Sequence, residues 1–145
     1  MGIIAEIVPF LGYTGKRASS VGRKRVQHPD FGKALRALLG STRDEERKMS
    51  GIICSALTQL DACRAEGKKH PDEKAMKGPL SEISSITLNN KGFSIRLYFT
   101  VLEDVIFMLH LDENKRRTYI TDGLEKTLLR KLKETRAQLK AEKKT

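Results

Sequence analysis

The chain has no tryptophan and only two cysteines, Cys54 and Cys63. The two cysteines lie nine positions apart in one predicted helix, about 13 Å from each other, which is too far for a disulfide. We interpret both as small buried hydrophobic residues in a reducing compartment. Neither belongs to a C-x-x-C pair, and His28, His70 and His110 lack ligand spacing. We therefore expect neither a metal nor another cofactor.

Long apolar runs are also missing. The apolar stretch at residues 3–11 is interrupted by Glu6 and Pro9, and it is far shorter than the roughly 20 residues that a membrane span needs. A secretory signal carries positive charge before its apolar stretch, whereas Lys16 and Arg17 follow this one. We expect a cytoplasmic protein with no membrane partner.

Several catalytic motifs are absent from the sequence. It contains no G-x-x-x-x-G-K-[ST], no G-x-G-x-x-G after a strand, no G-x-S-x-G and no H-E-x-x-H. Nucleotide hydrolysis by a P-loop, dinucleotide redox chemistry, serine esterase chemistry and zinc proteolysis therefore lack the residues that they require.

Positive charge is abundant. Lysine and arginine total 28 against 18 acidic residues, which gives a net charge of +10 and a pI near 9.8. Such a balance favours an anionic partner, and nucleic acid or the ribosome fits it best, with an acidic protein as the competing interpretation. Hydrophobic residues make up 39% of the 145 positions, enough for the core of one domain.

The first half of the chain predicts a strand within residues 3–10, a flexible basic loop at 15–27 and a helical hairpin. The first helix takes Asp30 as its N-cap and ends at Gly40. The second follows residues 41–43 and ends at Gly67. A proline-bearing, lysine-rich surface connection then covers residues 68–78.

The second half predicts three antiparallel strands and a helix. Apolar residues alternate in a hairpin around the turn at residues 89–92, and residues 105–111 form a nearly continuous apolar run typical of a buried central strand. Asp122 and Glu125 resemble a capping box at the start of a C-terminal helix. We expect an α+β domain at 29–145, an antiparallel sheet packed by an N-terminal helical hairpin and a C-terminal helix, with residues 1–28 as an extension.

One cluster of residues suits phosphate chemistry. RNA is cleaved when its 2′-hydroxyl attacks the adjacent phosphorus, so a protein needs mainly to orient the strand, neutralise charge and move protons. Arginines and a tyrosine can do this without a metal. The alternative is a solvated, charged turn. The candidate residues are Arg96 on a strand, His110, and Lys115, Arg116, Arg117 and Tyr119 after the buried strand.

A second group of basic residues offers candidate RNA contacts outside this cluster. Most of them lie in the predicted basic loop, for which a solvated loop is the alternative interpretation, and one lies in the hairpin turn. The group comprises Lys16, Arg17, Arg23, Lys24, Arg25 and Lys91.

Two segments resemble parts of the RelE/ParE superfamily and, within it, of the HigB-type toxins. The family's arginine-bearing strand is similar to GFSIRLYF (residues 92–99), and its buried strand with the following basic turn is similar to DVIFMLHLDENKRRTYI (104–120). The similarity covers about residues 29–139. It implies a RelE-like toxin of a type II toxin-antitoxin pair: a ribosome-dependent messenger-RNA endoribonuclease that inhibits translation and is held by an antitoxin, which in some pairs is a helix-turn-helix protein.

The resemblance also implies roles for individual residues. Arg96 matches the arginine that contacts the scissile phosphate, Arg116 or Lys115 matches the second basic residue, and Tyr119 is nearest to the late aromatic. The chain departs from RelE in the first hairpin strand, because residues 81–88 contain no lysine where RelE has two functional ones.

Two other hypotheses stay open. A non-catalytic module on the same fold would use its basic surface on nucleic acid or on a protein such as gyrase, as the ParE branch does. A phage-type regulator would bind an acidic partner through the basic loop and the basic face of the C-terminal helix. Charge-swap substitutions there, with Arg96 intact, would separate the regulator from the other two.

Overall fold

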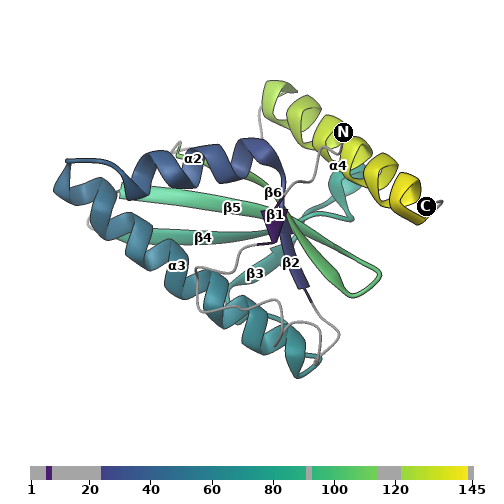
Figure 1. Ribbon diagram of the computed structural model, residues 1–145, viewed down its shortest axis with the longest axis horizontal. Helices are drawn as coiled ribbons and strands as arrows, with labels where there is room; N and C mark the ends of the chain where they lie inside the picture. Colours follow the sequence, from purple (N-terminus) through teal and green to yellow (C-terminus); the bar gives the residue numbers. More distant parts are fainter. Residues whose placement is uncertain (1–5, 8–23, 91–92, 114–121, 144–145) are drawn as a thin grey trace.

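The computed structural model describes residues 6–7, 24–90, 93–113 and 122–143. These residues form an α+β structure around a six-stranded sheet in the order β1-β2-β6-β5-β4-β3 (Figure 1). The strands are β1 (Glu6–Ile7), β2 (Lys24–Gln27), β3 (Glu73–Ala75), β4 (Ser84–Asn90), β5 (Phe93–Leu102) and β6 (Val105–Asp112).

The sheet is mixed, so the expectation of a purely antiparallel sheet is wrong. β2 runs parallel to β6, with Lys24 opposite Val105 and Gln27 opposite Met108, while the other neighbouring strands are antiparallel. Parallel neighbours need a long connection, and here the chain passes through two α-helices, a short 3-10 helix and three strands between β2 and β6. The local alternation of the β4–β5–β6 segment carries no information about this distant pairing.

Three α-helices belong to the described residues: α2 (Pro29–Leu39), α3 (Asp44–Ala65) and α4 (Asp122–Lys143), with a short 3-10 helix, η2 (Gly78–Leu80). The predicted helical hairpin and C-terminal helix are confirmed. The N-cap of α2 is His28 rather than Asp30, because His28 Nδ1 accepts the backbone N–H of Asp30 at 3.1 Å. Pro29 opens the helix, where its missing N–H costs nothing.

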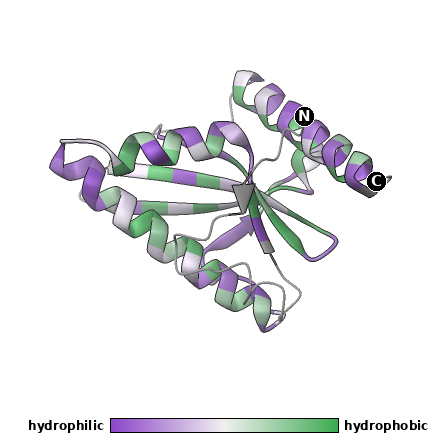
Figure 2. Cartoon of the chain, in the orientation of Figure 1, coloured by the Kyte–Doolittle hydropathy of each residue, from purple (hydrophilic) through white to green (hydrophobic). Residues whose placement is uncertain are grey.

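The sheet separates two hydrophobic clusters. Helices α2 and α3 cover one face, where Phe31 and Leu57 are fully buried with Ile95 of β5. α4 covers part of the other face, where its Leu128 packs in one cluster with Tyr98 of β5. Figure 1 shows α2 and α3 at the left of the molecule and α4 at the upper right, away from these two helices. Figure 2 shows green residues concentrated where the helices meet the sheet.

Two strands lie in segments that the sequence predicts to be loops. β2 ends the predicted basic loop, and its Arg25 is fully buried, with Nε 2.8 Å from Asp61 Oδ1 of α3. β3 lies within the predicted surface connection and pairs with Ser84–Ile86 of β4. Both strands are short and polar, so their pairing partners, and not an apolar pattern, give them their structure.

β5 and β6 are joined by two residues with positive φ, Glu103 at 52° and Asp104 at 65°. Positive φ at both central positions is the geometry of a type I′ turn, whose twist matches that of the adjoining strands. The β6 strand that follows is buried along most of its length, as its apolar run predicts.

None of the described helices is both long and apolar enough to cross a membrane. Cys54 and Cys63 are free thiols, and both are half-buried rather than fully buried.

Candidate nucleic-acid interface

The α4 side of the sheet has a polar region beyond the helix. Apolar residues of β4 and β5, such as Leu88 and Ile95, point to α2 and α3, so the alternating polar residues point to the opposite face. Thr87 and Asn89 are exposed, and the others are half-buried. We call this region the polar sheet face; it consists of Ser85, Thr87, Asn89, Ser94, Arg96 and Asp112.

Arg96 lies at the centre of the polar sheet face. It stands opposite Thr87 of β4 on one side and opposite Asp112 of β6 on the other. Two residue pairs further along, and so on the same face, the Ser94 hydroxyl donates to Asn89 Oδ1 across the same two strands. The guanidinium is therefore carried by an inner strand of the sheet, among side chains that can donate and accept hydrogen bonds.

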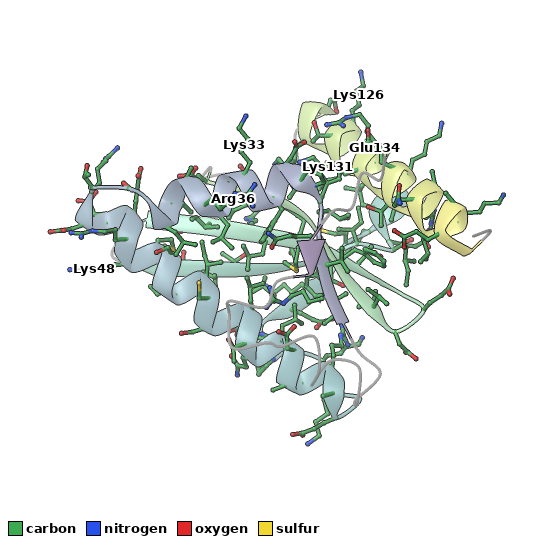
Figure 3. All side chains as sticks on the ribbon, viewed as in Figure 1. Lys33, Arg36, Lys48, Lys126, Lys131 and Glu134 are labelled. Atoms are coloured by element: carbon green, nitrogen blue, oxygen red, sulfur yellow. The ribbon has the colours of Figure 1, made fainter. Side chains whose placement is uncertain are left out.

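The polar sheet face adjoins a group of polar and charged residues between the sheet, α2 and α4, of which His28 and Lys131 are buried, His110 and Glu134 half-buried and Asp30 exposed. Lys131 of α4 is 2% exposed, and its Nζ donates to His110 Nδ1 at 2.8 Å and lies 3.5 Å from Asp30 Oδ2. His28 Nε2 donates to Glu134 Oε1 at 2.9 Å. We call His28, Asp30, His110, Lys131 and Glu134 the polar seam; Figure 3 shows Lys131 and Glu134 on the part of α4 beside the start of α2.

His110 links the polar seam to the polar sheet face. Its ring lies opposite Tyr98, with ring centroids 6.1 Å apart. Burial, and next the charge of Lys131, lowers the pKa of His110 to about 4, so the imidazole is neutral near pH 7. A neutral ring whose Nδ1 accepts from Lys131 carries its proton on Nε2.

The other charges of the polar seam compensate one another. Burial lowers the pKa of Lys131, while Asp30 opposes this shift. Burial acts to raise the pKa values of Asp30 and Glu134, but neighbouring hydrogen-bond donors and charges outweigh it, and both pKa values lie below their usual range. For Asp30 the chief opposing group is the Lys131 ammonium, and for Glu134 it is the hydrogen bond from His28, followed by Arg130. The seam therefore holds α4 against the sheet and α2 with paired charges.

Only a few of the candidate site residues from the sequence analysis lie within the described part of the chain. The structure brings Arg96 and His110 to the same face of the sheet. It buries Arg25 completely against Asp61, so Arg25 is not part of an exposed basic surface. Lys24 lies in β2. The remaining candidates lie outside the described residues: Lys16, Arg17, Arg23, Lys91, Lys115, Arg116, Arg117 and Tyr119.

Sequence reasoning missed the neighbours of Arg96. The alternation of Thr87 and Asn89 with Ile86 and Leu88 is a strand pattern with one polar face, and it could have indicated them. Nothing local indicates the polar seam, because His28 and Glu134 are 106 positions apart.

Among the described residues, no group of three or more His, Cys, Asp or Glu side chains could hold a metal ion. Comparisons with protein-family models, with curated proteins and with solved structures found no match to this chain. The site must therefore be interpreted from its own chemistry.

Proposed function

We propose that the protein is a RelE/HigB-type toxin that binds single-stranded RNA on the polar sheet face and cleaves it without a metal. The observation that carries this proposal is the position of Arg96, on an inner strand between Thr87 and Asp112 and on the same face as the exposed Thr87 and Asn89. A guanidinium on a rigid strand presents a fixed fork that matches the oxygens of a phosphate.

The neighbours of Arg96 suit an RNA strand. The hydroxyl of Thr87 and the amide of Asn89 are exposed and can bond to ribose hydroxyls and base edges, which an unpaired strand leaves free. Arg96 would neutralise the charge that develops on the phosphate while the 2′-hydroxyl attacks. Lys115, Arg116 and Tyr119 follow Asp112 within seven positions in the sequence. We assign them the second basic contact and the proton-transfer role that the resemblance implies.

The proposal includes the partners that the resemblance implies. The toxin would act on messenger RNA at the ribosome in the cytoplasm, and an antitoxin protein would hold it inactive. The net charge of +10 supports an RNA-rich partner, because phosphate contacts dominate the affinity of such complexes.

A non-catalytic binding module is the second candidate, and one observation favours it. Of the six residues of the polar sheet face, Arg96 is the one that carries positive charge, and Asp112 beside it reduces that charge. His110, the nearest histidine in register, is neutral and its Nδ1 already accepts from Lys131. On this hypothesis the protein binds nucleic acid or a protein target and breaks no bond.

Controlled expression in a bacterial host tests the proposal. Wild type, Arg96→Ala and Arg96→Lys are compared for growth, and messenger-RNA 5′ ends are mapped within minutes of induction. We expect growth arrest with new 5′ ends for wild type, loss of both for Arg96→Ala, and little rescue by lysine, which lacks the planar fork.

Arg36→Ala is the matched control, because Arg36 is an exposed arginine on α2, away from the polar sheet face. It should leave arrest and cleavage unchanged. Circular dichroism of the purified variants verifies that each is folded. Arrest without new 5′ ends would support the binding module, and cleavage that persists in folded Arg96→Ala would refute the role of Arg96.

A further inference from the structure

Helix α4 carries two kinds of basic side chain. Three of them pair with neighbouring residues: Arg130 with Glu134 at 3.1 Å, Arg136 with Glu82, and Lys131 within the polar seam. Three others are exposed and form no ion pair with any described residue. We call these three, Lys126, Lys133 and Lys140, the lysine stripe.

The lysine stripe follows one line along the helix. Its members are seven positions apart, so successive lysines rise about 10.5 Å and turn by only about 20°. The whole stripe spans about 21 Å. It lies opposite Leu124, Leu128 and Leu132, which are buried on the sheet, and Figure 3 shows Lys126 pointing away from the sheet.

The lysine stripe has few acidic neighbours. Glu134 is the one acidic residue between Lys126 and Lys140, and its carboxylate accepts a hydrogen bond from His28. Asp122 lies four positions before Lys126, but among the described residues Lys126 forms no ion pair. Figure 2 shows that hydrophilic residues, in purple, recur along the whole length of α4. The three lysines thus form no ion pair with any described residue, which favours an anion from another molecule as their partner.

The length of the lysine stripe and the composition of α4 indicate which kind of anionic partner it fits. Proteins that bind single strands commonly stack bases on aromatic side chains, and α4 has no aromatic residue. Helices that bind membranes insert their apolar face, but that face of α4 is already buried. A rigid row of cations at intervals of about 10.5 Å instead suits a duplex, whose two backbones present phosphates on either side of a major groove about 12 Å wide.

We infer that the lysine stripe is a docking surface for the phosphate backbone of duplex nucleic acid, such as a helical segment of a structured RNA. The stripe lies on the outer side of α4, whereas the polar sheet face belongs to the sheet that the inner side of α4 contacts. The protein would therefore hold a duplex on one surface and an unpaired strand on another. This inference requires a basic, folded α4 but no RNA cleavage.

Binding of labelled 20-base-pair RNA and DNA duplexes, measured by fluorescence anisotropy at 50 to 200 mM KCl, tests the inference. The stripe variant is Lys126→Gln/Lys133→Gln/Lys140→Gln. The matched control, Lys48→Gln/Lys69→Gln/Lys77→Gln, also removes three exposed lysines and lowers the net charge equally. Thermal unfolding by circular dichroism compares the stability of the three proteins.

We expect the slope of log Kd against log salt to fall by about 2 to 3 in the stripe variant, because each lost phosphate contact removes about 0.9. Wild type should thus lose about 40-fold more affinity than the stripe variant between 50 and 200 mM salt. The control should keep most of the wild-type slope. If the salt slope falls for both duplexes, the ligand is the phosphate backbone that RNA and DNA share. If it falls for the RNA duplex alone, the ligand is RNA.

Two outcomes would overturn the inference. In the first, a folded stripe variant binds both duplexes with the wild-type salt slope. In the second, the salt slope falls as much in the control variant as in the stripe variant, which would mean that net charge alone causes the effect. Arg96→Ala serves as a separate arm: it should abolish cleavage of messenger RNA and leave duplex affinity unchanged, so a failure of the proposed function is distinguishable from a failure of the stripe.

Discussion

Acid should weaken the protein through His110 before it protonates the carboxylates of the polar seam. The pKa of this histidine in the folded chain is about 4, because of burial and then of the nearby Lys131, whereas its ordinary value is 6.5. Asp112 and Asp30 oppose the shift, and His28 adds to it. The folded state therefore disfavours a proton on His110 that the unfolded chain accepts.

The sign and size of the effect follow from this difference. The contribution of neutral His110 to stability is fully present above pH 6.5 and is lost as the pH falls from 6.5 through 4. The full shift corresponds to about 3 kcal/mol at 1.36 kcal/mol per pKa unit. The ring is half-buried, and solvent screening lowers the expected loss between pH 7 and 4.5 to about 2 kcal/mol.

Two measurements test this prediction. An NMR titration of the His110 ring should give a pKa well below 6.5 in wild type and a higher one in Lys131→Met. Urea unfolding at pH 7, 6, 5 and 4.5 should show a loss of stability that His110→Asn reduces by about 2 kcal/mol, since asparagine keeps an acceptor for Lys131 but does not titrate there. Titration of His110 near 6.5, or an unchanged pH dependence in His110→Asn, would refute the reasoning.

Two further predictions concern the sheet. Asp61→Ala leaves the fully buried Arg25 without its carboxylate and should lower the free energy of unfolding by about 3 to 5 kcal/mol, measured by urea unfolding; a loss below about 1 kcal/mol would contradict the importance of this pair. Asp104→Gly should raise stability by about 1 kcal/mol, because glycine adopts the φ of 65° without strain. A lower melting temperature for Asp104→Gly would show that the aspartate side chain outweighs this strain.

The sequence predicts elements that local patterns specify. Alternation indicated the β5 strand, a continuous apolar run indicated β6, and leucine spacing with Asp122 and Glu125 indicated α4. Each of these signals comes from residues close together in the chain, which is why each prediction is confirmed.

The elements that escaped prediction depend on distant partners. β2 reads KRVQ and β3 reads EKA, and neither has an apolar pattern. Arg25 is buried because Asp61, 36 positions away, neutralises it. The polar seam joins residues from both ends of the described chain. For the candidate site, the sequence placed Arg96 on an inner strand correctly, while the roles of Lys115, Arg116 and Tyr119 stay predictions.

The parallel pairing of β2 with β6 also has a consequence for the order of assembly. β5 and β6 are closed by a turn of two residues, whereas the chain between β2 and β6 holds 77 residues. By the logarithmic dependence of loop closure on length, joining β2 to β6 costs about 3 kcal/mol more in chain entropy than joining β5 to β6. The hairpins β4–β5 and β5–β6 can thus form while the chain is still open. We therefore expect β2 to join the sheet after α2 and α3 have shortened that loop, and the β1–β2 edge to be the last part to close and the first to open.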